Sequence, residues 1–225
     1  MLGWIICREG CCGTLQRRVV CGMPFLVVEV PAVRRRADRR RLRSALRVME
    51  RYGVRQVVVQ GGTLPELAKF DMVQLDPYPL RRALLPQLME WIARAQAWDL
   101  KKETVLLSAQ SSCDKVWCAA VELSRMVRYV LPDTGAGQSV LEDALRRQLG
   151  LSAGGGTPVM EVCMDRTPHS RLPCLHLGQD CAQKQRIDLW WPKLPEADEN
   201  ILCALFLAEK IPIKEICVRF AEFRA

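Results

Sequence analysis

The sequence predicts an α/β protein with a mainly parallel, doubly wound sheet that has helices on both faces. Short apolar runs rich in Val, Ile and Leu alternate along the chain with longer amphipathic segments. Most of these runs are continuously apolar, which is typical of strands buried on both faces. Strands that alternate with helices are joined by right-handed crossovers, so neighbouring strands are expected to be parallel.

The N-terminal part, residues 1–30, predicts antiparallel strands. The short runs "WIIC", "RRVVC" and "FLVVEV" are separated by "REGCCG" and "GMP". Apolar runs bounded by Gly and Pro are typical of strands. We therefore expect a hairpin followed by a buried strand.

Residues 31–164 predict the alternating core. We expect helices over residues 34–52, 79–98 (divided at Pro86), 113–127 and 139–150, and strands over 55–60, 71–76, 103–110, 128–131 and 158–164. Gly53 and Gly150 are placed to end helices. Ser139, with Glu142 three residues later, predicts a helix cap.

The sequence pattern changes in residues 165–225. The segments "LPCLHLG" and "QRIDLWWP" predict a hairpin. A helix over 197–210 and a last strand in "IKEICVRF" are expected after it. This tail is expected to extend the sheet with antiparallel strands. The pair Trp190 and Trp191 could serve core packing or an oligomer contact.

Composition narrows the class of protein. The 225 residues are 49% hydrophobic and 26% charged, with a formal net charge of +8. These values exclude disordered, collagen-like and coiled-coil chains. No apolar run approaches the ~18 residues that cross a bilayer, and the first residues lack a basic leader. We therefore expect one soluble, cytoplasmic domain over residues 1–225, with its eleven cysteines reduced.

The block from Glu103 to Met164 resembles one half of a Rossmann fold. From about Met49 onward the chain is similar to uncharacterised bacterial proteins with a degenerate Rossmann-like domain. The resembling segments are "YGVRQVVVQ", "ETVLLSAQ", "AAVELSRMVRYVLPDTGAGQSVLEDALRRQLG" and "PVMEVCMD". The resemblance implies a fold but no catalytic residues, because no activity is assigned to such proteins. We therefore expect a binding, structural or regulatory role without catalysis.

Glycine turns after strands offer an alternative, a nucleotide- or anion-binding enzyme or sensor. The loop after residues 103–110 has no glycine, and its Ser111 and Ser112 predict a helix cap. Two other turns contain glycines that could form an anion-binding nest. The candidate residues are Gly61, Gly62, Thr63, Asp133, Gly135, Gly137 and Ser139. Neither turn carries a complete phosphate-binding motif.

A basic segment offers a second alternative, an accessory nucleic-acid binder. Nine arginines and only two acidic residues lie between Arg34 and Arg51. Arg36, Arg40, Arg43 and Arg47 lie on the helix face opposite the apolar positions. This pattern is typical of a phosphate-binding patch and also of an ordinary solvated helix face.

A cluster of cysteines and histidines predicts a possible metal site. Both histidines and three cysteines fall within nineteen residues, and Cys163, His169, Cys174 and His176 are the candidate ligands of a zinc ion. Cys174 and His176 share one face of a strand. The spacing lacks the paired C-x2-C of zinc ribbons, so the same cysteines could equally be small core residues.

Overall fold

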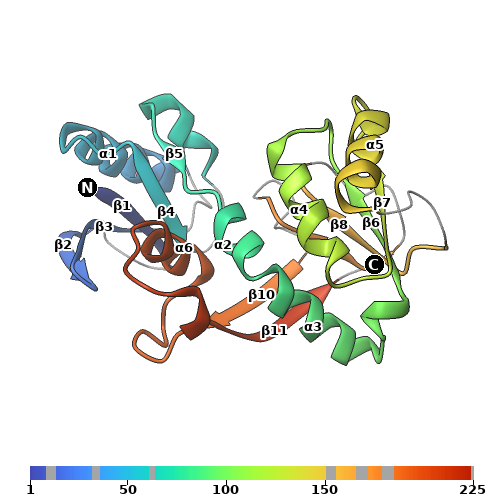
Figure 1. The fold of residues 1–225 in the computed structure, drawn as a ribbon. Coiled ribbons are helices and arrows are strands. Elements are labelled where there is room, and N and C mark those ends of the chain that lie inside the picture. The colour runs from blue at the N-terminus through green and yellow to red at the C-terminus, as the bar shows by residue number, and fades with distance from the viewer. Residues whose placement is uncertain are drawn as a thin grey trace. The chain divides into compact units, whose positions relative to one another are not determined.

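The computed structural model describes residues 1–8, 14–31, 36–60, 64–150, 156–165, 172–178 and 185–223 (Figure 1). The chain forms two compact units: residues 1–76 with 192–215, and residues 77–191 with 216–225. The α/β class and the predominance of parallel strands are confirmed. Whether residues 1–225 fold as one domain stays a prediction.

The first unit contains a five-stranded mixed sheet in the order β2-β3-β1-β4-β5. Its strands are β1 (Leu2–Arg8), β2 (Leu15–Val20), β3 (Met23–Pro31), β4 (Gln56–Gln60) and β5 (Val73–Gln74). β2 and β3 form an antiparallel hairpin, whereas β3, β1, β4 and β5 run parallel. The hairpin therefore follows a buried strand, where the sequence predicted a hairpin before one. The prediction of antiparallel strands at the N-terminus is therefore confirmed.

Helix α1 (Arg36–Arg51) covers one face of this sheet. Its apolar stripe of Leu42, Leu46 and Met49 is completely buried in the core beneath it. The helix ends where the sequence predicts, because Gly53 adopts a positive φ of 72° that favours glycine. A short 3-10 helix, Pro65–Phe70, adds to the same core.

Helix α6 (Glu199–Leu207) packs against β4. The side chain of Asp198 caps this helix by accepting a hydrogen bond from the Ile201 amide at 3.0 Å. Asn200 Nδ2 donates to the Val59 carbonyl at 3.0 Å, which ties α6 to the sheet.

The second unit contains a four-stranded, all-parallel sheet in the order β7-β6-β8-β9. Its strands are β6 (Thr104–Ser108), β7 (Tyr129–Asp133), β8 (Met160–Cys163) and β9 (Cys174–His176). Helix α4 (Asp114–Ser124) joins β6 to β7, and α5 (Gln138–Leu149) lies between β7 and β8. Parallel pairing requires such long connections.

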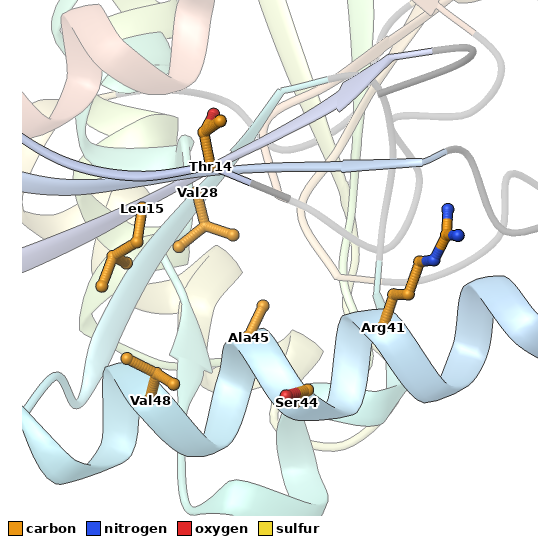
Figure 2. Close-up of a pocket in the computed structure, with 7 residues that line it drawn as sticks. All are labelled: Thr14, Leu15, Val28, Arg41, Ser44, Ala45 and Val48. Carbon is orange, nitrogen blue, oxygen red and sulfur yellow. The ribbon is translucent and has the colours of Figure 1, made fainter. Parts of the chain in front are cut away.

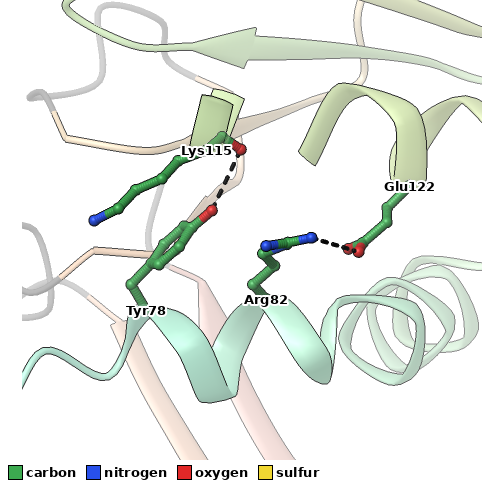
Figure 3. A network of polar contacts seen from close by, with 4 residues as sticks. All are labelled: Tyr78, Arg82, Lys115 and Glu122. Atoms are coloured by element: carbon green, nitrogen blue, oxygen red, sulfur yellow. Dashed lines mark hydrogen bonds and ion pairs between the residues drawn. The ribbon is translucent and has the colours of Figure 1, made fainter. Parts of the chain in front are cut away.

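Helices α2 (Tyr78–Ala83) and α3 (Leu85–Gln96) replace one long helix, as Pro86 predicts. Figure 3 shows how α2 docks on α4: Tyr78 Oη donates to the Lys115 carbonyl at 3.3 Å, and Arg82 pairs with Glu122 at 3.4 Å. Burial raises the pKa of Tyr78 to about 12, so the phenol keeps its proton and remains a donor.

The predicted pairing of the C-terminal strands is wrong. β9 pairs in parallel with β8, so it forms no hairpin with β10 (Gln185–Trp190). β10 instead pairs antiparallel with β11 (Cys217–Phe223), in a two-stranded sheet of its own. The described strands thus form three sheets where one was expected. Turn residues in the sequence indicate where the chain changes direction, but they do not indicate which strand a strand pairs with. Here α6 lies between β10 and β11 in the sequence.

Two predicted helix caps are also wrong. Helix α5 begins at Gln138 with Gly137 at its cap position, so Ser139 lies inside the helix. Helix α4 begins after Cys113, and no side chain caps it. The Ser112 amide donates to the Ala136 carbonyl at 3.1 Å, because the loop after β6 pairs with the turn after β7 and does not fold back onto its own helix.

Candidate metal centre

Three of the predicted metal ligands lie on two neighbouring strands. Cys163 is the last residue of β8, and His176 is the last residue of β9. The register pairs Cys163 with His176 and Glu161 with Cys174. Side chains two residues apart on a strand point to the same face. Cys163, Cys174 and His176 therefore project from one face of the parallel sheet.

The donor atoms of these three residues converge. The two Sγ atoms and a ring nitrogen of His176 all lie within 4.8 Å of one another. Tetrahedral zinc, with bonds of about 2.3 Å to sulfur and about 2.0 Å to nitrogen, needs its donors roughly 3.5–3.8 Å apart. Small side-chain rotations would therefore bring these donors onto one ion.

The three side chains are also buried, with exposed fractions of 0% for Cys163, 5% for Cys174 and 2% for His176. Burial of an isolated charge is costly, but two thiolates and a neutral imidazole around a divalent ion carry no net charge. The site is thus suited to a bound cation that is screened from solvent.

Arg81 of α2 holds the end of β9 in place. Its Nη1 donates to the carbonyl of His176 at 3.1 Å and to that of Gly178 at 3.0 Å. The side chain is only 3% exposed. Gly178 is needed at this point, because a Cβ there would collide with the carbonyl oxygen of Met164. The backbone after His176 is therefore held by the Arg81 hydrogen bonds and by close packing of Gly178 against Met164.

A buried carboxylate lies on the same face of the sheet. Ser108 Oγ donates a hydrogen bond to Glu161 Oε1, and both side chains are completely buried. The register places Ser108 beside Cys163 and Glu161 beside Cys174. The Ser108 hydrogen bond therefore satisfies one oxygen of the buried carboxyl group next to the candidate ligands.

The structure thus brings together Cys163, Cys174 and His176, whereas His169 lies outside the described residues. The sequence pattern does not predict Arg81, Ser108 or Glu161 as residues of the site. One signal was present for Glu161, a charged residue inside the apolar run "PVMEVCM". Arg81 gives no local signal, because its partners are about a hundred residues away.

At the turn where the sequence predicts an anion site, close packing explains the presence of Gly135 and Gly137. Gly135 and Gly137 adopt positive φ values of 53° and 83°. A Cβ on Gly135 would lie 3.3 Å from the Gln110 carbonyl oxygen, and one on Gly137 would lie 3.0 Å from Ser112 Cβ. These glycines allow two loops to pack closely, and Ser139 lies exposed on α5. Gly61, Gly62 and Thr63 lie outside the described residues.

Hydrogen bonds join the loops that follow β6 and β8. Ligands of open parallel sheets bind where the strand order reverses, at the carboxyl ends of the strands. Here the Gln110 amide donates to Asp165 Oδ1 at 2.8 Å, and Gln110 Nε2 donates to the Asp165 carbonyl at 3.2 Å. The Asp133 carbonyl accepts from the Ala109 amide at 3.0 Å. These hydrogen bonds join the segments that follow β6, β7 and β8 to one another, and nucleotide binding at the glycine turns stays a prediction.

The four arginines of the predicted nucleic-acid patch lie on α1 in the first unit. Arg40, Arg43 and Arg47 are exposed, and the backbone of Arg36 begins the helix. A cavity of about 380 Å³ lies between this helix and the β2–β3 hairpin (Figure 2). Its apolar lining includes Val28 and Val48.

The eight cysteines in the described ranges are present as thiols. No protein family and no curated protein matches the sequence. Within the described ranges, no helix is long and apolar enough to cross a membrane.

Proposed function

We propose that the protein is a non-catalytic α/β protein that binds one thiophilic divalent ion, with Zn²⁺ as the preferred metal. The observation that carries the proposal is the convergence of two buried thiols and one buried imidazole within 4.8 Å. Soft sulfur and imidazole donors favour zinc over magnesium or calcium. The role of the ion is structural or regulatory, because a site buried this deeply gives a substrate no route to the metal.

Several features support a structural role. The ion would link the ends of β8 and β9, and β9 is a short edge strand of only three residues. Short strands gain little from their own ladder, so a metal crosslink would add substantially to their stability. We also propose that this unit is a Rossmann-like, doubly wound half, which the strand order and the helices between its strands support.

The fourth ligand is a separate question. A closed structural zinc site has four protein ligands. His169, which the sequence predicts as a ligand, follows β8 by six residues. His169→Ala tests that prediction: the loss of zinc affinity would assign the fourth position to His169, and full retention would exclude it.

The direct test measures the metal in protein purified under reducing conditions without a chelator. We expect about one zinc per chain by elemental analysis and by the difference between native and denatured mass. Cys174→Ser and His176→Asn should lose the metal. The matched control is Cys203→Ser, which changes a buried thiol in the other unit and keeps a donor for the Asp76 carbonyl.

Cobalt provides a readout that does not depend on the fold of a variant. Co²⁺ added to the apo wild type should give the intense thiolate-to-metal absorption of a tetrahedral sulfur site. Wild-type protein that takes up neither Zn²⁺ nor Co²⁺ would overturn the proposal. So would a Cys163→Ser/Cys174→Ser variant that retains stoichiometric zinc.

A further inference from the structure

The exposed side of α1 carries a row of arginines, which we call the basic face: Arg40, Arg43, Arg47 and Arg51. At 100° per residue these four positions fall within an arc of about 80°, and they span about 16 Å along the helix axis. All four side chains are exposed, whereas the opposite stripe of the helix is buried. The row therefore forms a continuous cationic surface on one element.

Within the described part of the chain, the basic face keeps an excess of positive charge. Among the residues that the structure describes, none forms an ion pair with these four arginines. Arginines elsewhere do find partners: Arg55 with Asp71 at 2.9 Å and Arg94 with Glu90 at 3.4 Å. Helix α1 contains seven arginines and two acidic residues, Asp38 and Glu50. A surface with this excess of one sign favours association with an anion.

An exposed aromatic ring lies at the C-terminal end of the helix that carries the basic face. Tyr52 follows Arg51 directly, and its side chain is 48% exposed. The guanidinium of Arg17, on β2, lies 5.5 Å from the centre of this ring. An exposed ring beside cationic groups is the arrangement on which proteins stack nucleic-acid bases. The sequence alone shows no aromatic platform here, because Arg17 and Tyr52 are far apart in the chain.

A membrane surface fits this helix poorly. Interfacial helices insert apolar side chains between lipids. The large apolar residues of α1, Leu42, Leu46 and Met49, are completely buried beneath the helix. Arginine also binds phosphate through two parallel hydrogen bonds.

We propose that the basic face of α1, together with Arg17 and Tyr52, binds single-stranded nucleic acid. The arginines contact the phosphates, and Tyr52 stacks on a base. The binding is independent of base sequence, because phosphate contacts carry no sequence information. This proposal concerns the first unit and does not depend on the metal in the second.

The test measures fluorescence anisotropy of a labelled 20-nucleotide oligothymidine with the full-length protein between 50 and 300 mM salt. Four phosphate contacts predict a slope of about −3 for log K against log salt. Arg40→Gln/Arg43→Gln/Arg47→Gln should lower the affinity at least tenfold and reduce the steepness of the slope by about 2. Tyr52→Leu should lower the affinity about tenfold without changing the slope.

The matched control variant has the same net charge as the triple variant of the basic face. Arg94→Gln/Arg146→Gln/Arg147→Gln removes three exposed arginines from helices of the second unit and should bind like the wild type. All of these substitutions are at exposed positions, and thermal unfolding verifies that each variant is folded. Equal losses in the two triple variants would overturn the proposal, because net charge alone would then explain the binding. Binding to phosphatidylserine vesicles or polyglutamate in place of the oligonucleotide would also overturn it.

Discussion

Asp198 is both the cap of α6 and a carboxyl that burial keeps from ionising easily. Its Oδ1 accepts from the Ile201 amide, yet desolvation raises its pKa from 3.8 to about 6. Between pH 4 and 6 the unfolded chain has already lost this proton while the folded chain still binds it. The contribution of Asp198 to stability is therefore largest below pH 4 and is lost as the pH rises through 6.

Asp198→Asn should remove this dependence, because asparagine is an equally good helix cap and carries no charge. We expect the variant and the wild type to be similarly stable near pH 4. The variant should be more stable by roughly 1–3 kcal/mol at pH 7. Urea unfolding followed at several pH values measures this difference.

The matched control is Asp143→Asn on the surface of α5, where Asp143 lies 3.9 Å from Arg147. It should change the free energy of unfolding by less than about 1 kcal/mol, with no pH trend of this kind. Parallel stability curves for Asp198→Asn and the wild type would contradict the shifted pKa.

At the scale of the element, the short strand β9 depends on a helix far away in sequence. Arg81→Met would remove two hydrogen bonds and leave the carbonyls of His176 and Gly178 without this donor. We expect a loss of about 2–4 kcal/mol in the free energy of unfolding. Because Arg81 positions the backbone of a proposed ligand, zinc affinity should also fall about 10- to 100-fold. Competition with a chromophoric chelator measures that affinity.

Arg82→Met is the control for this helix. Arg82 is the next residue, and it forms a partly exposed ion pair with Glu122. It should cost about 1 kcal/mol or less and leave zinc affinity unchanged. Arg81→Lys, which retains a donor, should recover part of the affinity. An Arg81→Met variant that is less stable but binds zinc like the wild type would restrict Arg81 to a structural role.

The predicted elements show what local pattern can and cannot determine. The helix over α1 and its end at Gly53 were predictable, because apolar spacing and a positive-φ glycine are local properties. The pairing of β10 with β11 was not, because α6 intervenes in the chain. Cys163, Cys174 and His176 were predictable as a group from residue type. Their shared face depends on the parallel pairing of β8 with β9, which the sequence did not predict.

At the scale of the whole molecule, the two proposed activities fall in different units. The basic face belongs to the unit of residues 1–76 and 192–215, and the candidate metal ligands belong to the other. The formal net charge of the whole chain is +8, and the segment from Arg34 to Arg51 alone carries nine arginines against two acidic residues. Long-range attraction of an anion is therefore concentrated on α1.

Removal of the metal should consequently affect the units unequally. A ligand stabilises only the structure that binds it, so a chelator should loosen the sheet that contains β8 and β9. Hydrogen exchange should accelerate at the Glu161 and Leu177 amides, which bond to the carbonyls of Pro173 and Cys163. The amides of β1 and β4 should exchange at unchanged rates. Hydrogen exchange read by mass spectrometry, with and without chelator, measures both sets in one sample.

The Cys174→Ser variant provides the control for chelation, since it should exchange like the chelated wild type and show no further response to the chelator. Faster exchange in both units after chelation would mean that the ion stabilises the chain as a whole. Unchanged exchange at β8 and β9 in protein that has lost its zinc would show that the ion contributes nothing to this sheet. The structural role would then be wrong, and a regulatory role for the bound ion would be the one to pursue.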